Sequence, residues 1–428
     1  MARTLDVYLH TDLVGRLAQD DDGDMSFQYA ERWLQTAGAV PLSHSLPLRA
    51  KRFRRKECRG FFGGILPEEA KREMIARNLG ISARNDYAML ERIGGECAGA
   101  VTFRPHGEPM PDRRYGYRDL SDEELAAIMK ELPRRPLLAG EEGIRLSLAG
   151  AQDKLAVRLE GQTISLPLGG APSTHILKPN VERFEGVVFN EAFCMRLAAT
   201  AGLPAAAVET REVGGISFLL VERYDRHHRP VPDGAPAVER LHQEDFCQAL
   251  GIVPEQKYQK EGGPSLKQCF ALLRDVSSVP AIDVARLLDD VVFNWVVGNN
   301  DAHGKNFSLV YRTGGGGGGG GGRGGGGELE IRLAPLYDLV STIYYPELSR
   351  DMAMRIGEQY SSERVTLRDF EKLAEEVKLG RPLVRQRLIE VTERLRAALP
   401  NVPATSPVAE QVRDLIRTRS EEALAAFR

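Results

Sequence analysis

A cluster of polar residues, NNDAHGKNF at positions 299–307, directly follows an apolar stretch and contains groups that could do chemistry. Asp301 and Asn306 stand five positions apart, which matches the D-x-x-x-x-N spacing of a protein-kinase catalytic loop. In such a loop the aspartate accepts the proton of the substrate hydroxyl, and the asparagine holds a magnesium ion. The spacing therefore predicts phosphoryl transfer, with Asp301 as the catalytic base.

Phosphoryl transfer needs three more parts, and the sequence offers them in kinase order. A second acid should follow on a strand to hold magnesium between the phosphates, and LAPLYD places Asp338 there. A lysine should hold the phosphates from an earlier strand, and HILKP places Lys178 after an apolar approach. A helical glutamate should orient that lysine. Glu191, near the start of the next expected helix, is placed for this role.

A phosphate-binding loop is the remaining requirement, and the chain has no G-x-G-x-x-G motif for it. The stretch SLAGAQDK, residues 147–154, offers small residues flanked by a serine and a lysine. Small residues allow backbone N–H groups to approach phosphate oxygens. This stretch could therefore cradle ATP, although an ordinary turn would have the same composition.

Each of these residues also has a purely structural interpretation. Asp301 and Asn306 could be loop and cap residues, because a single D-x-x-x-x-N is common. His303 could be a metal ligand of a hydrolase, but no second histidine cluster completes such a site, so we interpret it as a group that braces the loop. Lys178 could end a solvated strand, and Glu191 could be a surface acid near a helix N-terminus. The ordered set favours phosphoryl transfer over these separate interpretations.

The elements that would position these groups follow from hydrophobic periodicity. Apolar residues from Leu287 to Val296 recur at helical spacing and stop at Gly298, which predicts a buried helix that ends just before the polar cluster. Alternation around residues 5–9 predicts a strand, and Ser121 with Glu124 has the spacing of a capping box. Further helices are expected at 67–79, 86–93, 190–201, 367–377 and 412–427. This order predicts an α+β protein that becomes mostly helical after about residue 241.

Composition limits the remaining possibilities. The chain has 428 residues and is 42% hydrophobic, and this composition predicts a soluble globular protein. The net charge of −3 predicts no bulk attraction to nucleic acid or membrane. The five cysteines are far apart and lack zinc-site spacing, which favours reduced core thiols. No signal segment or membrane span is visible. We expect a reducing cytoplasm.

Two biased segments have mainly structural interpretations. The polyglycine tract at 314–327, interrupted by Arg323, behaves as flexible coil and predicts an expanded loop between strands at 307–311 and 329–334. The basic run RAKRFRRK, residues 49–56, could contact DNA, but such runs are more often solvated surface.

In combination these motifs resemble those of the HipA family of serine/threonine kinases, toxins of type II toxin-antitoxin modules. The resemblance rests on SLAGAQDK at 147–154, Lys178, ERYDR at 222–226, QEDF at 243–246, DAHGKN at 301–306 and YD at 337–338. The first third is similar to the family's N-terminal subdomain through SLPL at 45–48, FFGGILP at 61–67 and GAV at 99–101.

The resemblance implies a HipA-like kinase fold of the α+β class. It implies a small α/β N-terminal subdomain at 1–110, a mixed N-lobe with the ATP-binding loop at 111–240, and a mostly helical C-lobe with the catalytic loop at 241–428. It implies ATP and Mg²⁺ as cofactors, with Asn306 and Asp338 on the metal. It also implies autophosphorylation of Ser147, with Asp301, His303 and Lys178 as catalytic residues. The implied ATP-binding residues are Ala149, Gly150, Ala151, Gln152, Asp153, Lys154, Lys178, Glu222, Arg223, Tyr224, His303, Gly304, Lys305, Asn306, Tyr337 and Asp338.

Partners follow from the same resemblance. It implies a HipB-like antitoxin of helix-turn-helix type, operator DNA bound through the antitoxin complex, and an aminoacyl-tRNA synthetase as the phosphorylated protein, so that translation stops and the cell becomes dormant. Two other functions remain open. The chain could be a catalytically weak corepressor that tightens the antitoxin on DNA, or a kinase of a small molecule or lipid head group. The filled catalytic positions favour the protein kinase.

Overall fold

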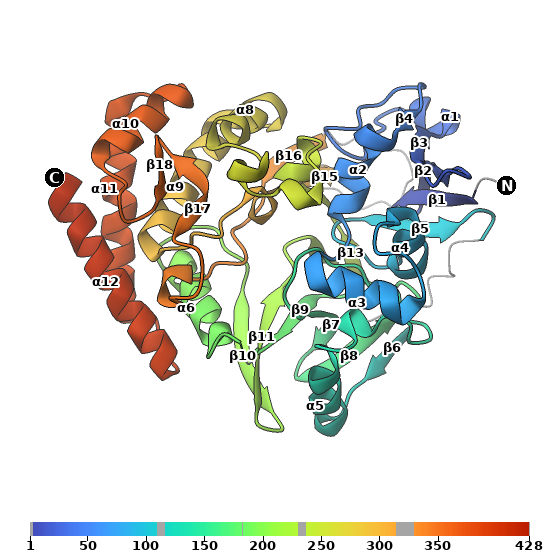
Figure 1. The fold of residues 1–428 in the computed structure, drawn as a ribbon, viewed down its shortest axis with the longest axis horizontal. Helices are drawn as coiled ribbons and strands as arrows, with labels where there is room; N and C mark the ends of the chain where they lie inside the picture. The colour runs from blue at the N-terminus through green and yellow to red at the C-terminus, as the bar shows by residue number, and fades with distance from the viewer. Residues whose placement is uncertain (1–2, 109–115, 182, 230–236, 314–328, 428) are drawn as a thin grey trace. The chain divides into compact units, whose positions relative to one another are not determined.

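The computed structural model describes residues 3–108, 116–181, 183–229, 237–313 and 329–427 (Figure 1). The chain divides into two compact units. Unit 1 comprises Met1–Leu177, Arg223–Glu255 and Leu309–Arg332, and unit 2 comprises Lys178–Glu222, Gln256–Ser308 and Leu333–Arg428. The predicted polyglycine loop lies outside the described residues.

Unit 1 begins with a five-stranded antiparallel sheet of order β4-β3-β2-β1-β5. Its strands are β1 (Arg3–Leu9), β2 (Asp12–Gln19), β3 (Met25–Tyr29), β4 (Phe53–Arg54) and β5 (Val101–Pro105). The predicted strand at 5–9 is confirmed, because Leu5, Val7 and Leu9 are buried. Phe62 of α2 (Arg55–Gly64) packs its ring 5.3 Å from that of Phe27, and this contact holds the helix against the sheet. Short α1 (Glu31–Leu34) follows β3.

Helices α3 (Glu69–Leu79) and α4 (Asp86–Ile93) follow α2 and agree with the helices expected there. Beyond β5, strands β6 (Gly116–Asp119), β8 (Thr163–Leu168), β7 (Leu155–Glu160) and the first residues of β9 (His175–Pro179) pair antiparallel in that order. Helix α5 (Asp122–Glu131) starts at the predicted capping box, in which Ser121 Oγ accepts from the N–H of Glu124.

The rest of unit 1 consists of short elements. Strands β12 (Arg226–Arg229) and β13 (Ala237–Arg240) form a hairpin. A three-stranded sheet has the order β14 (His242–Asp245), β15 (Ser308–Thr313) and β16 (Leu329–Leu333), and α7 (Phe246–Ala249) continues from β14 and contacts α2.

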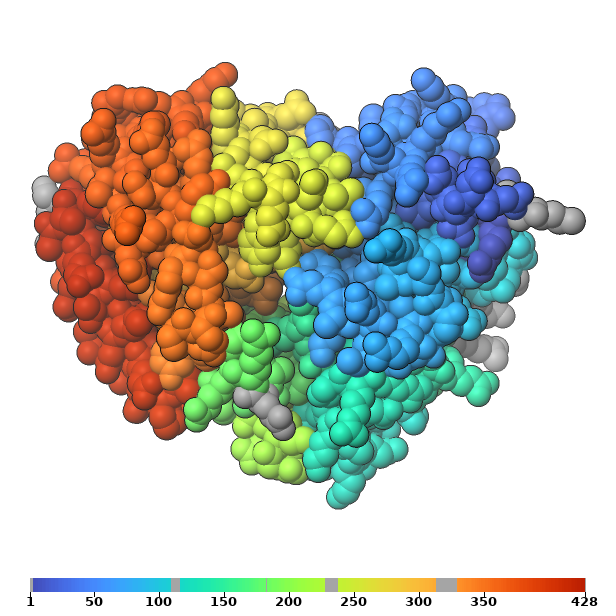
Figure 2. Space-filling model, viewed as in Figure 1, coloured from blue at the N-terminus to red at the C-terminus, as the bar shows by residue number. Residues whose placement is uncertain are grey.

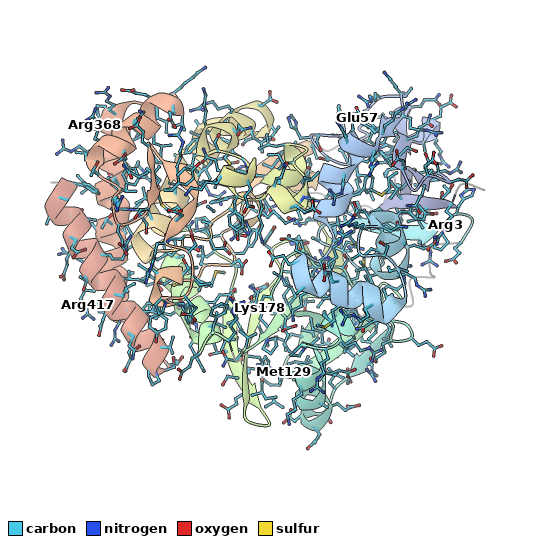
Figure 3. All side chains as sticks on the ribbon, in the orientation of Figure 1. Arg3, Glu57, Met129, Lys178, Arg368 and Arg417 are labelled. Carbon is cyan, nitrogen blue, oxygen red and sulfur yellow. The ribbon has the colours of Figure 1, made fainter. Side chains whose placement is uncertain are left out.

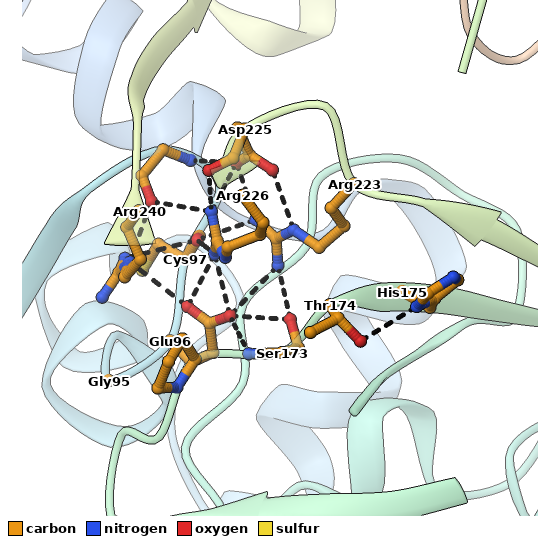
Figure 4. Close-up of polar contacts among 12 residues, drawn as sticks. Gly95, Glu96, Cys97, Ser173, Thr174, His175, Arg223, Asp225, Arg226 and Arg240 are labelled. Carbon is orange, nitrogen blue, oxygen red and sulfur yellow. Dashed lines mark hydrogen bonds and ion pairs between the residues drawn. The ribbon is translucent and has the colours of Figure 1, made fainter. Parts of the chain in front are cut away.

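A buried ion-pair network fixes the segment at 223–226 within unit 1 (Figure 4). Arg223 bonds both Asp225 and Glu96, and Arg226 Nη2 lies 2.8 Å and 2.9 Å from the two carboxylate oxygens of Glu96. Burial opposes ionisation of Glu96, but the guanidinium groups of Arg226, Arg240 and Arg223 outweigh it and lower its pKa to about 2. The acids here are therefore charged at neutral pH.

A second buried acid of unit 1 has the opposite balance. Glu244 is fully buried and accepts from Ser43 Oγ at 2.5 Å, from the N–H of His44 at 3.0 Å and from Tyr311 Oη. Burial raises its pKa to about 7, although the hydrogen bonds of Ser43 and Tyr311 act to lower it.

Unit 2 is mostly helical. Its helices are α6 (Val187–Thr200), α8 (Leu266–Val276), α9 (Pro280–Val297), α10 (Leu367–Glu376), α11 (Arg381–Ala398) and α12 (Pro407–Phe427), with hairpins β10 (Val208–Val213)–β11 (Ile216–Glu222) and β17 (Asp351–Ile356)–β18 (Gln359–Ser361). Helix α9 is buried over most of its length and packs on α8, α11 and α12. Figure 2 shows α12, in red, on the surface of unit 2. The buried residues of α12 are mostly apolar, so its apolar side faces the rest of this unit.

Candidate active site

The loop that follows α9 is held at its first residues by buried amides. The helix ends at Gly298, whose φ of 72° is the left-handed conformation that glycine adopts without strain. Asn299 Nδ2 donates to Asn294 Oδ1 at 2.8 Å, and the N–H of Asn300 donates to Thr342 Oγ1 at 2.8 Å. Both asparagines are buried. The polar cluster is thus the braced end of a core helix, as its sequence predicts.

Asp301, unlike its neighbours, is exposed, so its carboxylate can meet a substrate. Tyr258 Oη donates to Asp301 Oδ1 at 2.7 Å. The Asp301 carbonyl accepts from the N–H of His303 at 2.7 Å and from Asn306 Nδ2 at 3.2 Å, which closes the loop around its own backbone. Asp301 and Asn306 are therefore held together by a direct contact. His303 is buried with its ring edge-on to Tyr258 at 5.5 Å, in agreement with a bracing role.

A second set of contacts joins this loop to the segment that carries Asp338. Residues Gly304–Asn306 form a single 3₁₀ turn, and the Lys305 carbonyl accepts from Tyr337 Oη at 2.7 Å. Tyr337 Oη also lies 2.7 Å from Ser308 Oγ. Since Tyr337 precedes Asp338 and Lys305 precedes Asn306, the two predicted metal ligands follow residues that touch.

Asp338 does not lie on a strand, and the sequence-based prediction is wrong on this point. Leu336 forms only an isolated parallel bridge with Ala205, and the chain then turns into a left-handed conformation at Asp338, where φ is 58°. Such a φ is uncommon outside glycine and is frequent at functional sites. The turn directs the carboxylate to Lys178.

Lys178 bonds two carboxylates of unit 2; Figure 3 labels it on β9. Its Nζ lies 2.6 Å from Glu191 Oε1 and 2.7 Å from Asp338 Oδ1. The side chains of Lys178 and Glu191 are 7% and 1% exposed, whereas that of Asp338 is 41% exposed. Burial acts against the charge of Lys178, but Asp338 and Glu191 outweigh it, so the pKa of Lys178 is raised and the ammonium persists at any physiological pH.

Glu191 approaches Lys178 from the second turn of α6 rather than from its first residue, because the helix begins at Val187 instead of near Asn190. Asn190 fixes the same turn. Its Nδ2 donates to the Ser341 carbonyl at 3.1 Å, and its Oδ1 accepts from the N–H of Ser341 at 2.9 Å. The segment after Asp338 is thereby tied to the helix that carries Glu191.

The oxygen groups of this site fit a magnesium ion better than a metal with an all-protein shell. Among the described residues, no group of three or more His, Cys, Asp or Glu side chains is placed to hold a metal ion. Mg²⁺ commonly takes one or two carboxylates and completes its shell with phosphate oxygens and water. The carboxylate of Asp338 and the amide oxygen of Asn306 would suffice for such a site.

The predicted nucleotide loop at 147–154 belongs to unit 1 and is held by the segment at 65–71. Ser147 is fully buried, and its Oγ donates to the Ile65 carbonyl at 3.0 Å. The Gly150 carbonyl accepts from the N–H of Glu68 at 3.3 Å. Lys154 Nζ donates to the Ala149 carbonyl at 2.6 Å. Gly150 has a φ of 103°, a backbone conformation that strains residues with a Cβ, so this position favours glycine.

The three residues that the resemblance assigns to the adenine side, 222–224, lie at the end of β11 and directly after it. Glu222 ends β11 in unit 2, and its N–H donates to the Ala207 carbonyl at 2.8 Å. In unit 1, Arg223 is buried in the ion-pair network of Figure 4, so its side chain is already occupied. Tyr224 Oη donates to Gln243 Oε1 at 2.6 Å.

Within unit 2 the structure brings Lys178 together with Glu191 and Asp338, and Asp301 with Asn306. The sequence analysis missed Tyr258, which contacts Asp301 from 43 positions away. No motif contains it, so pattern alone carried no signal. The cysteines are buried and free of disulfides, as predicted.

Comparison with known proteins decides the family. Residues 5–104 match the HipA N-terminal domain, and residues 146–400 match the HipA-like C-terminal domain. The chain belongs to the HipA family. Its fold agrees with this, because it aligns with a TM-score of 0.83 and 26% identity to HipA in the structure of the Shewanella oneidensis HipA, HipB and operator DNA complex, over 99% of this chain and 98% of that one.

Two sequence relatives of the family span nearly the same length. The chain is 47% identical over 406 residues to the putative kinase Y4mE of Sinorhizobium fredii, which covers 94% of this chain and 92% of that protein. It is 28% identical over 420 residues to the serine/threonine-protein kinase toxin HipA of Shewanella oneidensis, with 95% and 91% covered. In the part of the chain that the structure describes, we find no helix with the length and apolar character needed to span a membrane.

Proposed function

We propose that this protein is a serine/threonine protein kinase of the toxin type, which transfers the γ-phosphoryl group of ATP to a protein hydroxyl. The observation that carries the proposal is the pairing of buried Lys178 with Glu191 and Asp338 at 2.6 Å and 2.7 Å. This is the lysine–glutamate pair that phosphoryl-transfer enzymes of the kinase type need for phosphate binding. The family and the names of two relatives support it.

In this proposal the exposed carboxylate of Asp301 accepts the proton of the acceptor hydroxyl. Tyr258 keeps that carboxylate in place and leaves its other oxygen for the substrate. The contact between Asn306 Nδ2 and the Asp301 carbonyl leaves the Asn306 amide oxygen as a metal ligand. The proposed base, Asp301, and the proposed metal ligand, Asn306, are thus held in a fixed relation by one hydrogen bond.

Lys178 would bind phosphate oxygens, and Asp338 would exchange part of its contact with Lys178 for the metal ion. Asp338 is suited to this exchange because its side chain is 41% exposed, whereas Glu191 stays buried and keeps the lysine oriented. When bound, Mg²⁺ supplies charge neutralisation between the phosphates.

The proposed acceptors are Ser147 of the chain itself and a seryl residue of a second protein, for which an aminoacyl-tRNA synthetase is our candidate. Phosphorylation of a synthetase would stop translation and arrest growth. Ser147 must leave its buried position before phosphate can reach it. A phosphate group on Ser147 would carry a charge of about −1.5 to −2. This charge would repel the phosphates of ATP and expel the loop.

The test is an incubation of purified protein with magnesium and radiolabelled ATP, alone and with a cell extract, beside Asp301→Asn. Label on Ser147 and on an extract protein that requires Asp301 would support the proposal and identify the target. If the label appeared only on a small molecule or lipid, the acceptor class would be wrong. If no label appeared despite ATP binding, the kinase proposal would fail.

A second role, corepression, is supported by the likeness to a HipA in complex with HipB and operator DNA. We infer a HipB-like helix-turn-helix partner through which this protein would reach DNA. If that role is separate from catalysis, Asp301→Asn and Asp338→Asn leave the operator affinity of the complex unchanged. Loss of DNA binding in both variants would contradict the separation.

A further inference from the structure

The nucleotide loop of unit 1 is held by the segment at 65–71 and also by the Glu96 carbonyl, which accepts from the N–H of Ser147 at 2.9 Å. Ser147, Gly150 and Asp153 each contact a residue of the segment at 65–71. The first two contacts end on backbone atoms of Ile65 and Glu68. The third is an ion pair between side chains. Lys71 Nζ, on α3, lies 2.5 Å from Asp153 Oδ1.

The ion pair is largely shielded from water, so its loss should weaken the closed loop. The side chains of Lys71 and Asp153 are 17% and 7% exposed, so water screens the pair only weakly. Removal of the lysine charge would leave a nearly buried carboxylate unpaired, which is costly. The two other contacts are single neutral hydrogen bonds, one of them 3.3 Å long. Of the three described contacts between the loop and the segment at 65–71, this pair is the charged one.

We propose that Lys71 is a positioning residue that holds the 147–154 loop closed through Asp153, and thereby slows the phosphorylation of Ser147. The proposal rests on the kinase function proposed above and on the prediction from the sequence that this loop binds ATP. Lys71 does not touch the reacting groups. It acts on the equilibrium between a closed loop, which serves transfer to other proteins, and an open loop, which exposes Ser147.

The first measurement does not require activity. Hydrogen exchange of the peptide that covers 147–154 is compared between the wild-type full chain and Lys71→Met without nucleotide. The exchange rate of these amides is proportional to the population of the open loop. Loss of the ion pair should raise that population, and therefore the exchange rate, roughly tenfold or more. The neighbouring strand at 155–160 is the internal reference and stays unchanged.

The second measurement separates positioning from general damage. At saturating ATP, Lys71→Met labels Ser147 faster by a factor similar to that seen in exchange, whereas labelling of a separate protein substrate does not rise. Lys71→Arg keeps the charge and restores both values most of the way. The matched control Lys130→Met, at an exposed position on α5, changes neither. If Lys71→Met is too unstable to purify, Lys71→Gln takes its place.

Unchanged exchange at 147–154 in a folded Lys71→Met protein would overturn the proposal, as would equal acceleration of Ser147 and substrate labelling. The two proposals fail separately. A wild-type protein that labels nothing refutes the kinase function, and the exchange measurement still decides whether Lys71 fastens the loop.

Discussion

The contrast between Glu191 and Asp338 gives a quantitative prediction, because both contact Lys178 but differ in burial. Glu191 is 1% exposed and Asp338 is 41% exposed at the side chain. Glu191→Gln removes a buried charge-assisted hydrogen bond, which stabilises by about 1.5–3 kcal/mol. Asp338→Asn removes a partly exposed pair, for which about 1 kcal/mol or less is typical. Glu191→Gln should therefore destabilise the protein more.

The order should reverse for activity. Without its buried partner, Lys178 still contacts Asp338 but loses orientation, so Glu191→Gln should lower kcat/KM for ATP by about 10- to 100-fold if a similar free energy is lost in the transition state. Asp338→Asn removes the only charged metal ligand in the proposed site and should lower it further. Free energies of unfolding from urea titration and initial rates at varied ATP measure the two effects.

The matched control is Glu347→Gln, an exposed glutamate of unit 2, which should change neither quantity. The reasoning fails if Asp338→Asn is the more destabilising of the two variants, or if Glu191→Gln retains full kcat/KM.

Three further predictions each concern a single residue. Tyr258→Phe removes the hydroxyl that holds Asp301 and should lower kcat about three- to tenfold, far less than Asp301→Asn; equal loss in the two variants by steady-state kinetics would contradict a supporting role. Burial raises the pKa of Glu244 from 4.5 to about 7, so its stabilising contribution is complete below pH 4.5 and is lost as the pH rises through 7. In Glu244→Gln the fall in unfolding free energy between pH 5 and pH 8 should shrink by up to about 3 kcal/mol, and an unchanged fall would refute the assignment. Gly298→Ala forces a Cβ to 2.2 Å from Ile343 Cδ1 at a φ of 72° and should cost at least about 1–2 kcal/mol in urea unfolding; wild-type stability would show that the loop tolerates a side chain there.

Local patterns predicted the elements that carry the site. The apolar period from Leu287 to Val296 and its stop at Gly298 locate α9 and the start of the polar loop that follows it, because helix periodicity and the glycine end signal are both local. The order of kinase parts along the sequence predicted roles for Lys178, Glu191 and Asp338 before any distance was known. The structure then places these three side chains in contact.

Long-range pairs could not be predicted in the same way. Tyr258 contacts Asp301, and Lys71 contacts Asp153, but a lone tyrosine or lysine has no distinguishing neighbours in the sequence. Asp338 was expected on a strand because its approach is apolar, whereas only an isolated bridge forms there and the backbone turns left-handed. Such a turn depends on tertiary contacts, which propensity does not include. The predicted boundaries at 110 and 240 stay predictions.

The central claim is that Lys178, Asp301, Asn306 and Asp338 transfer phosphate from ATP to a protein serine. Its most direct test is mass spectrometry of Ser147 after a single turnover with ATP, because this acceptor is part of the chain and needs no identified target. We predict phosphate on Ser147 in the wild-type protein with magnesium, and none in Asp301→Asn or in EDTA. Phosphate on Ser147 in Asp301→Asn at the wild-type rate would contradict the claim.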